Sequence, residues 1–208
     1  MARLKEYNGY YCESEYEYAF IGFLETEGWI YSSGNNISRV TKRDVLIADD
    51  FKKFIVDTNP DLTEDEVTQI FDNVRLVGSE SDFATLHKVY GWMVNGIQFT
   101  PQDGIARMIP LIDFKKDSNK NIFRVVNQFT VEYTNNGQKE NRRPDVLLFV
   151  NGMPLCVIEL KNPADANATI YDAWEQINIR YWRDIPHLLH YCTLACISDG
   201  VKTRLGTV

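Results

Sequence analysis

The chain has 208 residues, of which 44% are hydrophobic and 25% charged, and its formal net charge is −7. This is the composition of an ordinary globular protein, and the length is enough for a sizeable core. No apolar run is long enough to cross a bilayer and the first residues lack the apolar stretch of a signal peptide, so we expect a cytoplasmic protein without membrane contact.

The negative charge is concentrated in the first half of the chain. Residues 1–100 carry 9 basic and 17 acidic side chains, whereas residues 101–208 carry 13 basic and 12 acidic ones. Affinity for duplex DNA depends heavily on contacts from Lys and Arg to phosphate. The second half is therefore the less repulsive one for phosphate, and we do not expect the chain alone to bind DNA tightly.

The first hundred residues are predicted to be mainly helical and acidic. The segment after Ser14 has helical periodicity and ends near Gly28, and Ser14 with Glu17 has the spacing of a capping box. Two further helices, and a third segment that is either helix or loop, are expected at residues 38–59, 63–77 and 81–95. We interpret this region as a packed helical layer.

From residue 104 onward the pattern is that of strands. Four are expected, with the sequences ARMIPLIDF, FRVVNQFTVEY, DVLLFV and PLCVIEL, followed by a helix over 169–182 and a last strand over 193–197. Asn151-Gly152 is a two-residue hairpin turn. Asn127 and Gln128 are interpreted as polar groups at a sheet edge, and a position facing DNA is the alternative. The prediction is an antiparallel meander that feeds a mixed sheet with one helical crossover.

The hairpin at Asn151-Gly152 would place Asp145 beside Glu159, with Lys161 on the same face of its strand as Glu159. Mg²⁺, or Mn²⁺ as its substitute, prefers oxygen ligands, which Asp145, Glu159 and the carbonyl of Leu160 can supply. The metal would stabilise charge on a phosphate and help to ionise a water, and the ammonium of Lys161 would orient that water or stabilise the phosphate. An ordinary charged strand end is the alternative, but this strand is apolar on both faces.

Four cysteines are present, and we interpret them as buried free thiols rather than as a zinc site because no CxxC pair occurs and the chain has only three His. They are Cys12, Cys156, Cys192 and Cys196.

The pattern Pro144-Asp145, then Glu159-Leu160-Lys161 with the continuation Asn162-Pro163, resembles the N-terminal nuclease domain of the restriction (R, motor) subunit of type I restriction–modification enzymes. The segments SEYEYAFIGFLETEGW, DAWEQINIRYWRDIP and ISDGVKTRLGT also resemble that family, which belongs to the PD-(D/E)XK nuclease superfamily. The resemblance implies an α/β restriction-endonuclease-like fold, a central mixed β-sheet flanked by helices, in one domain over 1–208. Residues 1–100 would be its mainly helical part, and 101–208 its sheet and catalytic core.

The function implied is that of a type I site-specific deoxyribonuclease, which hydrolyses phosphodiester bonds of double-stranded DNA with Mg²⁺. Its catalytic residues would be Asp145, Glu159 and Lys161. The modification (M) and specificity (S) subunits would be its partners. The chain would be a fragment, and ATP would serve only an absent translocase part, since no P-loop motif occurs here. A stand-alone nuclease or resolvase of the same fold, and a non-enzymatic interaction domain, are the alternatives.

Two further groups of residues are assigned by this resemblance. RecB-type nucleases carry Gln-xxx-Tyr on the helix after the motif, touching the active site or DNA, and here Gln176 and Tyr181 have one more residue between them. Core packing is the alternative for Tyr181. In the superfamily an acidic residue of the first helix often approaches the metal, and here Glu15 or Glu17 would do so. Stabilisation of the helix N-terminus is the alternative for both.

Overall fold

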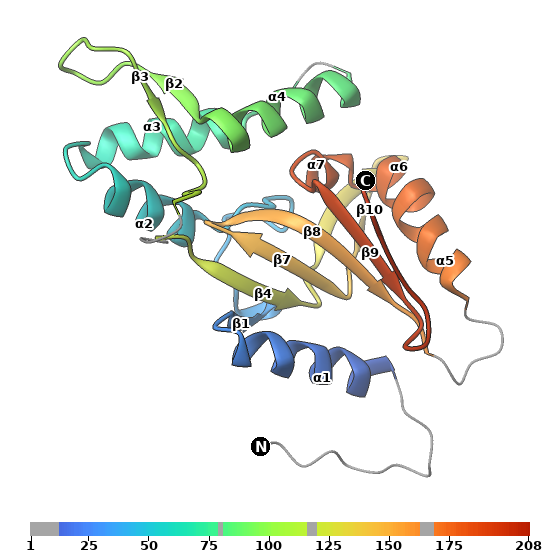
Figure 1. Ribbon diagram of the computed structural model, residues 1–208. Coiled ribbons are helices and arrows are strands. Elements are labelled where there is room, and N and C mark those ends of the chain that lie inside the picture. Colours follow the sequence, from blue (N-terminus) through green and yellow to red (C-terminus); the bar gives the residue numbers. More distant parts are fainter. Residues whose placement is uncertain (1–12, 79–80, 116–119, 163–168) are drawn as a thin grey trace.

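The computed structural model describes residues 13–78, 81–115, 120–162 and 169–208. A mixed sheet of six strands lies at its centre, in the order β1-β4-β7-β8-β9-β10 (Figure 1). The strands are β1 (Ile30–Ser33), β4 (Phe123–Asn127), β7 (Val146–Val150), β8 (Met153–Leu160), β9 (Leu194–Ser198) and β10 (Thr203–Gly206). Strands β1 and β4 are parallel, as are β8 and β9, whereas β4, β7 and β8 run antiparallel. The mixed sheet is the one that the sequence predicts.

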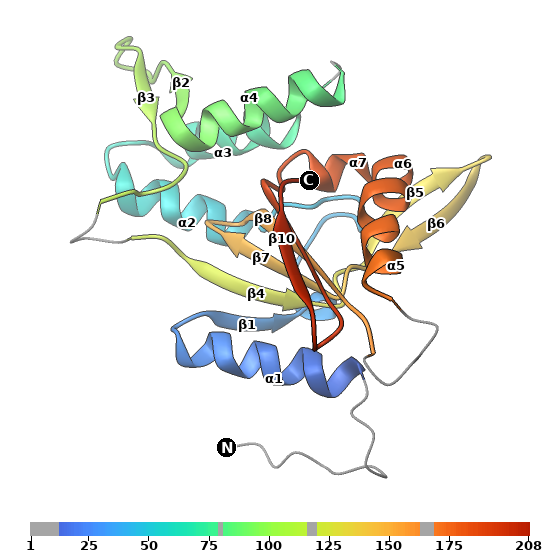
Figure 2. The ribbon, with the colours of Figure 1, turned by 45° about the vertical axis from the view of Figure 1, so that its right-hand side comes forward.

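Helices cover both faces of this sheet (Figures 1 and 2). Alternate residues of a strand point to opposite faces, and Val125, Val146 and Ile158 pack with Ile21 of α1 (Glu13–Thr26). Their neighbours Val126, Leu147 and Val157 pack on the other face in the larger core cluster. That cluster also includes residues of the segment from α5 (Ile170–Glu175) through a π-helical stretch to α6 (Trp182–Asp184) and α7 (Pro186–Leu189).

A second group of elements lies on the side of the sheet away from α1 (Figure 2). It consists of α2 (Ala48–Thr58), α3 (Glu64–Arg75), α4 (Asp82–Asn95) and a two-stranded sheet of β2 (Ile97–Phe99) and β3 (Arg107–Ile109). Thr63 and Glu66 form a capping box at the start of α3. The first helix of the group is shorter than expected because residues 38–47 are irregular, and α1 already starts at Glu13, so Ser14 lies inside that helix rather than at its cap.

The predicted meander is wrong in two places. The stretch FRVVNQFTVEY forms two strands, because β4 ends at Asn127 and β5 (Val131–Asn135) pairs with β6 (Gln138–Arg142) in a separate two-stranded sheet. Between them Gln128 has a φ of 54°, which ends the extended conformation. The stretch ARMIPLIDF contributes only β3, which pairs with β2 and not with the central sheet.

The β7–β8 hairpin forms as the sequence predicts. Asn151 and Gly152 have φ values of 52° and 76°, the two positive values that a type I′ turn requires. The turn is buried, and the Gly152 carbonyl accepts a hydrogen bond of 2.8 Å from the N–H of Ile47. A Cβ at Gly152 would lie 2.2 Å from the Ile47 carbonyl oxygen, so the close approach itself demands glycine here.

Cys156 and Cys192 are buried, Cys196 is half-buried, and all three are free thiols, as predicted. Cys12 and Pro163 lie outside the described residues. Among the helices that the structure describes, none combines the length and the apolar composition needed to span a membrane.

Candidate active site

The register of the central hairpin places Asp145 opposite Glu159. Val146 pairs with Ile158, so the residue before the first strand and the residue after Ile158 come together. Glu159 is fully buried and Asp145 is half-buried, and the N–H of Leu160 donates a hydrogen bond of 2.8 Å to Asp145 Oδ2. Two carboxylates 14 positions apart in sequence therefore meet at one end of the two central strands, as predicted.

Both oxygens of Glu159 are held by the helical segment of the β8–β9 crossover. The Tyr181 hydroxyl donates to Glu159 Oε1 at 2.6 Å, and Gln176 Nε2 donates to Oε2 at 2.6 Å. Gln176 Oε1 in turn accepts a hydrogen bond of 3.2 Å from Lys161 Nζ. One amide therefore connects the carboxylate and the ammonium, and it fixes Lys161 on the same side of β8 as Glu159.

A π-helical turn explains the unusual spacing of Gln176 and Tyr181. Residues Gln176–Tyr181 form a π-helix, in which the backbone bonds connect positions five apart instead of four. The extra residue is absorbed in this wider turn, and Gln176 Nε2 lies 2.9 Å from the Tyr181 hydroxyl. Tyr181 also packs in the core, with 1% of its surface exposed, so the ring has the packing role and the hydroxyl faces the site.

The electrostatics of the pair are unfavourable without a cation. Burial raises the pKa of Glu159 well above its ordinary value, and the neighbouring Asp145 carboxylate raises it further, while Tyr181 and Lys161 act in the opposite direction. Burial likewise raises the pKa of Tyr181, and the charge of Glu159 adds to the effect. A cation beside both carboxylates would offset the desolvation and the repulsion together.

Of the two acidic residues considered on the first helix, Glu17 is the one that the structure brings to this end of the sheet. It is 4% exposed. Its Oε1 accepts a hydrogen bond of 2.6 Å from Asn127 Nδ2, and its Oε2 accepts one of 2.9 Å from Gln128 Nε2. Burial raises the pKa of Glu17, the hydrogen bonds from Asn127 and Gln128 act in the opposite direction, and the charge of Asp145 adds to the rise. Glu15 lies two positions away on the helix and therefore on a different side of it.

Asn127 and Gln128 are not the edge groups that the sequence suggested. Asn127 is buried in the sheet, paired with Ser33 on one side and Val146 on the other. Its Oδ1 accepts a hydrogen bond of 3.1 Å from the Tyr31 hydroxyl. This bond fixes the amide of Asn127 so that its NH₂ group faces Glu17. No motif spacing in the sequence indicates these contacts, because they join residues 96 to 111 positions apart.

The donor set fits a hard cation. Within the part of the chain that the structure describes, no three His, Cys, Asp or Glu side chains gather closely enough to hold a metal ion between them. Asp145 and Glu159 are a pair, and each Glu159 oxygen keeps a lone pair beyond the one that accepts a hydrogen bond. Mg²⁺ is usually held by one or two carboxylates and keeps several waters, whereas zinc sites need three or four protein ligands. The pair therefore suits Mg²⁺.

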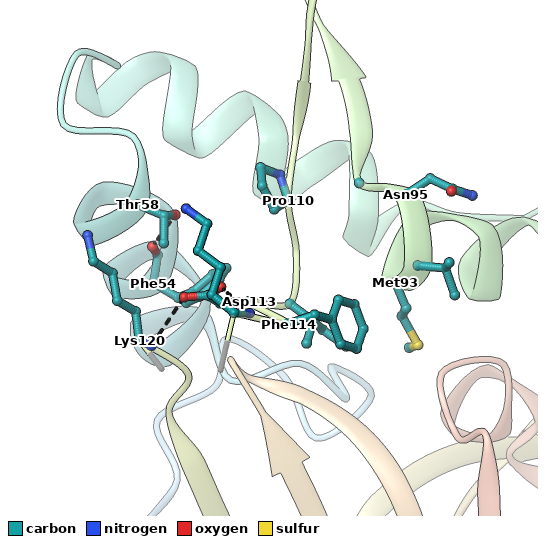
Figure 3. Close-up of a pocket in the computed structure, with 12 residues that line it drawn as sticks. Phe54, Thr58, Met93, Asn95, Pro110, Asp113, Phe114 and Lys120 are labelled. Atoms are coloured by element: carbon teal, nitrogen blue, oxygen red, sulfur yellow. Dashed lines mark hydrogen bonds between the residues drawn. The ribbon is translucent and has the colours of Figure 1, made fainter. Parts of the chain in front are cut away.

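A separate hollow of about 510 Å³ lies between α2, the end of α4 and the segment after β3 (Figure 3). Its acidic lining residue is Asp113, whose carboxylate accepts hydrogen bonds from the N–H groups of Lys115 and Lys120. Neither Asp145 nor Glu159 lines this hollow, and its described lining residues include no carboxylate besides that of Asp113.

A central mixed sheet flanked by helices, with two carboxylates at one end of its central hairpin, is the architecture that the resemblance of the sequence implies. Residues 10–208 match the family model "Type I restriction enzyme R protein N terminus". The chain belongs to this family.

Two relatives span nearly the whole chain. It is 34% identical, over 92% of its length, to the putative type I restriction enzyme MjaIXP endonuclease subunit of Methanocaldococcus jannaschii. It is 30% identical, over 94% of its length, to the type I restriction enzyme HindI endonuclease subunit of Haemophilus influenzae. The match covers 19% of each of these relatives, so the chain spans about a fifth of their length.

Tyr181→Phe should separate the hydroxyl of this residue from its ring. The buried Glu159 loses one donor, so we expect the free energy of unfolding to fall by about 1–3 kcal/mol and DNA cleavage to fall as well. Urea unfolding and a single-turnover cleavage assay measure the two effects. Tyr191→Phe is the matched control, because it removes a buried hydroxyl that donates to the Val74 carbonyl, away from the site. Equal cleavage by the two variants would leave the Tyr181 hydroxyl with a structural role only.

Proposed function

We propose that the chain is the Mg²⁺-dependent nuclease domain of a type I restriction subunit and hydrolyses phosphodiester bonds of double-stranded DNA. The observation that carries this proposal is the meeting of Asp145, Glu159 and Lys161 at one end of the central hairpin, with Gln176 bonded to both Glu159 and Lys161. The names of the relatives, which are endonuclease subunits, support the same reaction.

Each residue has a definite role in this proposal. Asp145, Glu159 and the carbonyl of Leu160 would hold Mg²⁺, which stabilises charge on a phosphate and makes a bound water easier to ionise. Lys161, whose Nζ is bonded to Gln176, would place its positive charge against the phosphate or orient the attacking water. Gln176 and Tyr181 keep the Glu159 carboxylate in one orientation, because each donates to a different oxygen.

The remaining parts of the activity would belong to a larger assembly. The relatives are about five times as long as the part matched here. We propose that residues 1–208 form one nuclease domain of such a chain, that an ATP-driven translocase makes up other parts of it, and that modification and specificity subunits complete the enzyme. With a net charge of −7, this domain depends on those other parts to hold the DNA. The family match favours this assignment over a stand-alone nuclease or resolvase.

Calorimetric titration with Mn²⁺ tests the metal assignment without any cleavage assay. We expect the chain to bind Mn²⁺ and Glu159→Gln to weaken that binding by at least about tenfold, since one of two charged ligands is gone. Glu64→Gln, which removes an exposed carboxylate in the first turn of α3, should bind as the unaltered chain does. If Glu159→Gln binds Mn²⁺ as tightly as Glu64→Gln, Glu159 is not a ligand.

A further inference from the structure

Gln128 has a left-handed backbone conformation, which glycine adopts freely, asparagine and aspartate tolerate, and glutamine rarely adopts. It follows β4 directly, and its φ of 54° lies in the left-handed region, which L-residues with a Cβ rarely adopt. Strained residues of this kind persist only where the surrounding structure holds them, and they gather at functional sites. A glycine would turn the chain at this point without the strain, so the side chain of Gln128 requires its own explanation.

The contacts of Gln128 join two acidic residues from different elements. Its backbone N–H donates 3.0 Å to the carbonyl oxygen of Asp145, which extends the β4–β7 ladder by one bond beyond the pair of Asn127 and Val146. Its side-chain Nε2 donates 2.9 Å to Glu17 Oε2. One residue therefore fixes the main chain at Asp145 and the carboxylate of Glu17 at the same time.

The surrounding structure keeps the turn in place. A Cβ at Gly34 would lie 2.6 Å from both the Gln128 carbonyl oxygen and the Phe129 Cα, so the segment is packed directly against a buried glycine. On the following residues, the Arg39 guanidinium lies 3.9 Å from the centre of the Phe129 ring and donates 2.9 Å to the Thr130 carbonyl. These contacts fix the backbone from the Gln128 carbonyl to Thr130, and the bond from the Gln128 N–H to Asp145 fixes it on the other side. From this fixed backbone the side-chain amide reaches Glu17.

We propose that Gln128 is a positioning residue of the nuclease site, which sets the place of the Glu17 carboxylate relative to Asp145. The inference rests on the proposed nuclease function and deepens it. Its strained backbone orients the amide, and the amide holds Glu17. A substitution that relieves the backbone strain at Gln128 and also removes its amide therefore affects stability and activity differently. We expect cleavage to fall, while the stability of the fold does not.

Two substitutions at Gln128 test this. Gln128→Gly keeps the backbone N–H bond to Asp145, relieves the strain and removes the amide. Gln128→Asn also tolerates the left-handed conformation, but its amide is one carbon short of Glu17. For both we expect a Tm within about 2–4 °C of the unaltered chain. In the complete enzyme, single-turnover cleavage should fall about 10- to 100-fold, the usual effect of losing a residue that orients a functional group.

The matched control is Asn136→Gly in the β5–β6 turn. Asn136 has a φ of 48° and is exposed, so this change introduces glycine at another left-handed position away from the carboxylates and should leave cleavage unchanged. Cleavage by Gln128→Gly at the unaltered rate would overturn the inference. A fall in the Tm of Gln128→Gly well beyond about 2–4 °C would also overturn the inference, because the role of Gln128 would then be structural.

Asp145→Asn in the same series distinguishes a failure of the positioning role of Gln128 from a failure of the proposed nuclease function. If Asp145→Asn is inactive and Gln128→Gly is fully active, only the positioning role fails. If Asp145→Asn cleaves DNA normally, the nuclease assignment of this site fails, and the positioning role fails with it.

Discussion

Asp145→Asn should abolish DNA cleavage by the complete restriction enzyme while the domain stays folded. The asparagine oxygen can still accept the hydrogen bond from the Leu160 N–H, so the hairpin keeps its connection. The change removes the negative charge that would hold the metal ion, and without the ion the charge that develops on the reacting phosphate is not stabilised. We expect a loss of at least about 10³-fold in single-turnover rate, which corresponds to several kcal/mol of transition-state stabilisation.

The stability of Asp145→Asn should equal or exceed that of the unaltered chain. Asp145 contributes to the raised pKa of the buried Glu159, so its charge is a repulsion that the variant lacks. Urea unfolding measures this. Asp49→Asn, which removes an exposed carboxylate in the first turn of α2, is the control. It should leave cleavage unchanged and lower the free energy of unfolding by no more than about 1 kcal/mol, because that carboxylate favours the helix N-terminus. Full cleavage activity in Asp145→Asn would end the nuclease proposal for this site.

Lys161→Ala should lose cleavage by about 10²- to 10³-fold and still bind Mn²⁺. An ammonium is not a metal ligand, and its removal leaves Asp145 and Glu159 in place. Metal binding can tighten slightly, because one positive charge near the ion is gone. Calorimetric titration of the variant gives the affinity, and single-turnover assays give the rate.

Two controls accompany Lys161→Ala. Lys139→Ala removes an exposed lysine of β6 that pairs with Glu132, and it should leave both the rate and the affinity unchanged. Lys161→Arg keeps the charge but replaces a compact ammonium by a planar guanidinium, so we expect it to recover only part of the rate. Lys161→Ala could instead lose Mn²⁺ binding as completely as Glu159→Gln does. That result would show that the lysine positions the metal ligands and has no separate role in the reaction.

The central hairpin could be predicted from the sequence because its signals are local. Asn151 and Gly152 accept positive φ values readily, and the apolar runs on both sides are of matched length. Once the turn is known, the two-residue period of strands decides which side chains meet, and Asp145 comes opposite Glu159. The side of Lys161 follows from the same period.

The rest of the site depends on contacts between distant segments. The strand containing Asn127 ends before Gln128, and the sequence has no glycine or proline there to indicate that it ends. The choice of Glu17 over Glu15 depends on where α1 packs against the sheet, which its own sequence does not specify. Strand β1, with the sequence IYSS, is too short and too polar to stand out before β4 pairs with it.

The π-helical turn between Gln176 and Tyr181 has a consequence for how such domains are recognised. A search pattern that counts residues between the glutamine and the tyrosine rejects this helix, although both side chains contact the same carboxylate. A gap of one position in an alignment would here mark a wider turn and no change in the site. Distances between side chains, and not numbers of intervening residues, are therefore the criterion by which members with one residue more or fewer in this helix should be compared.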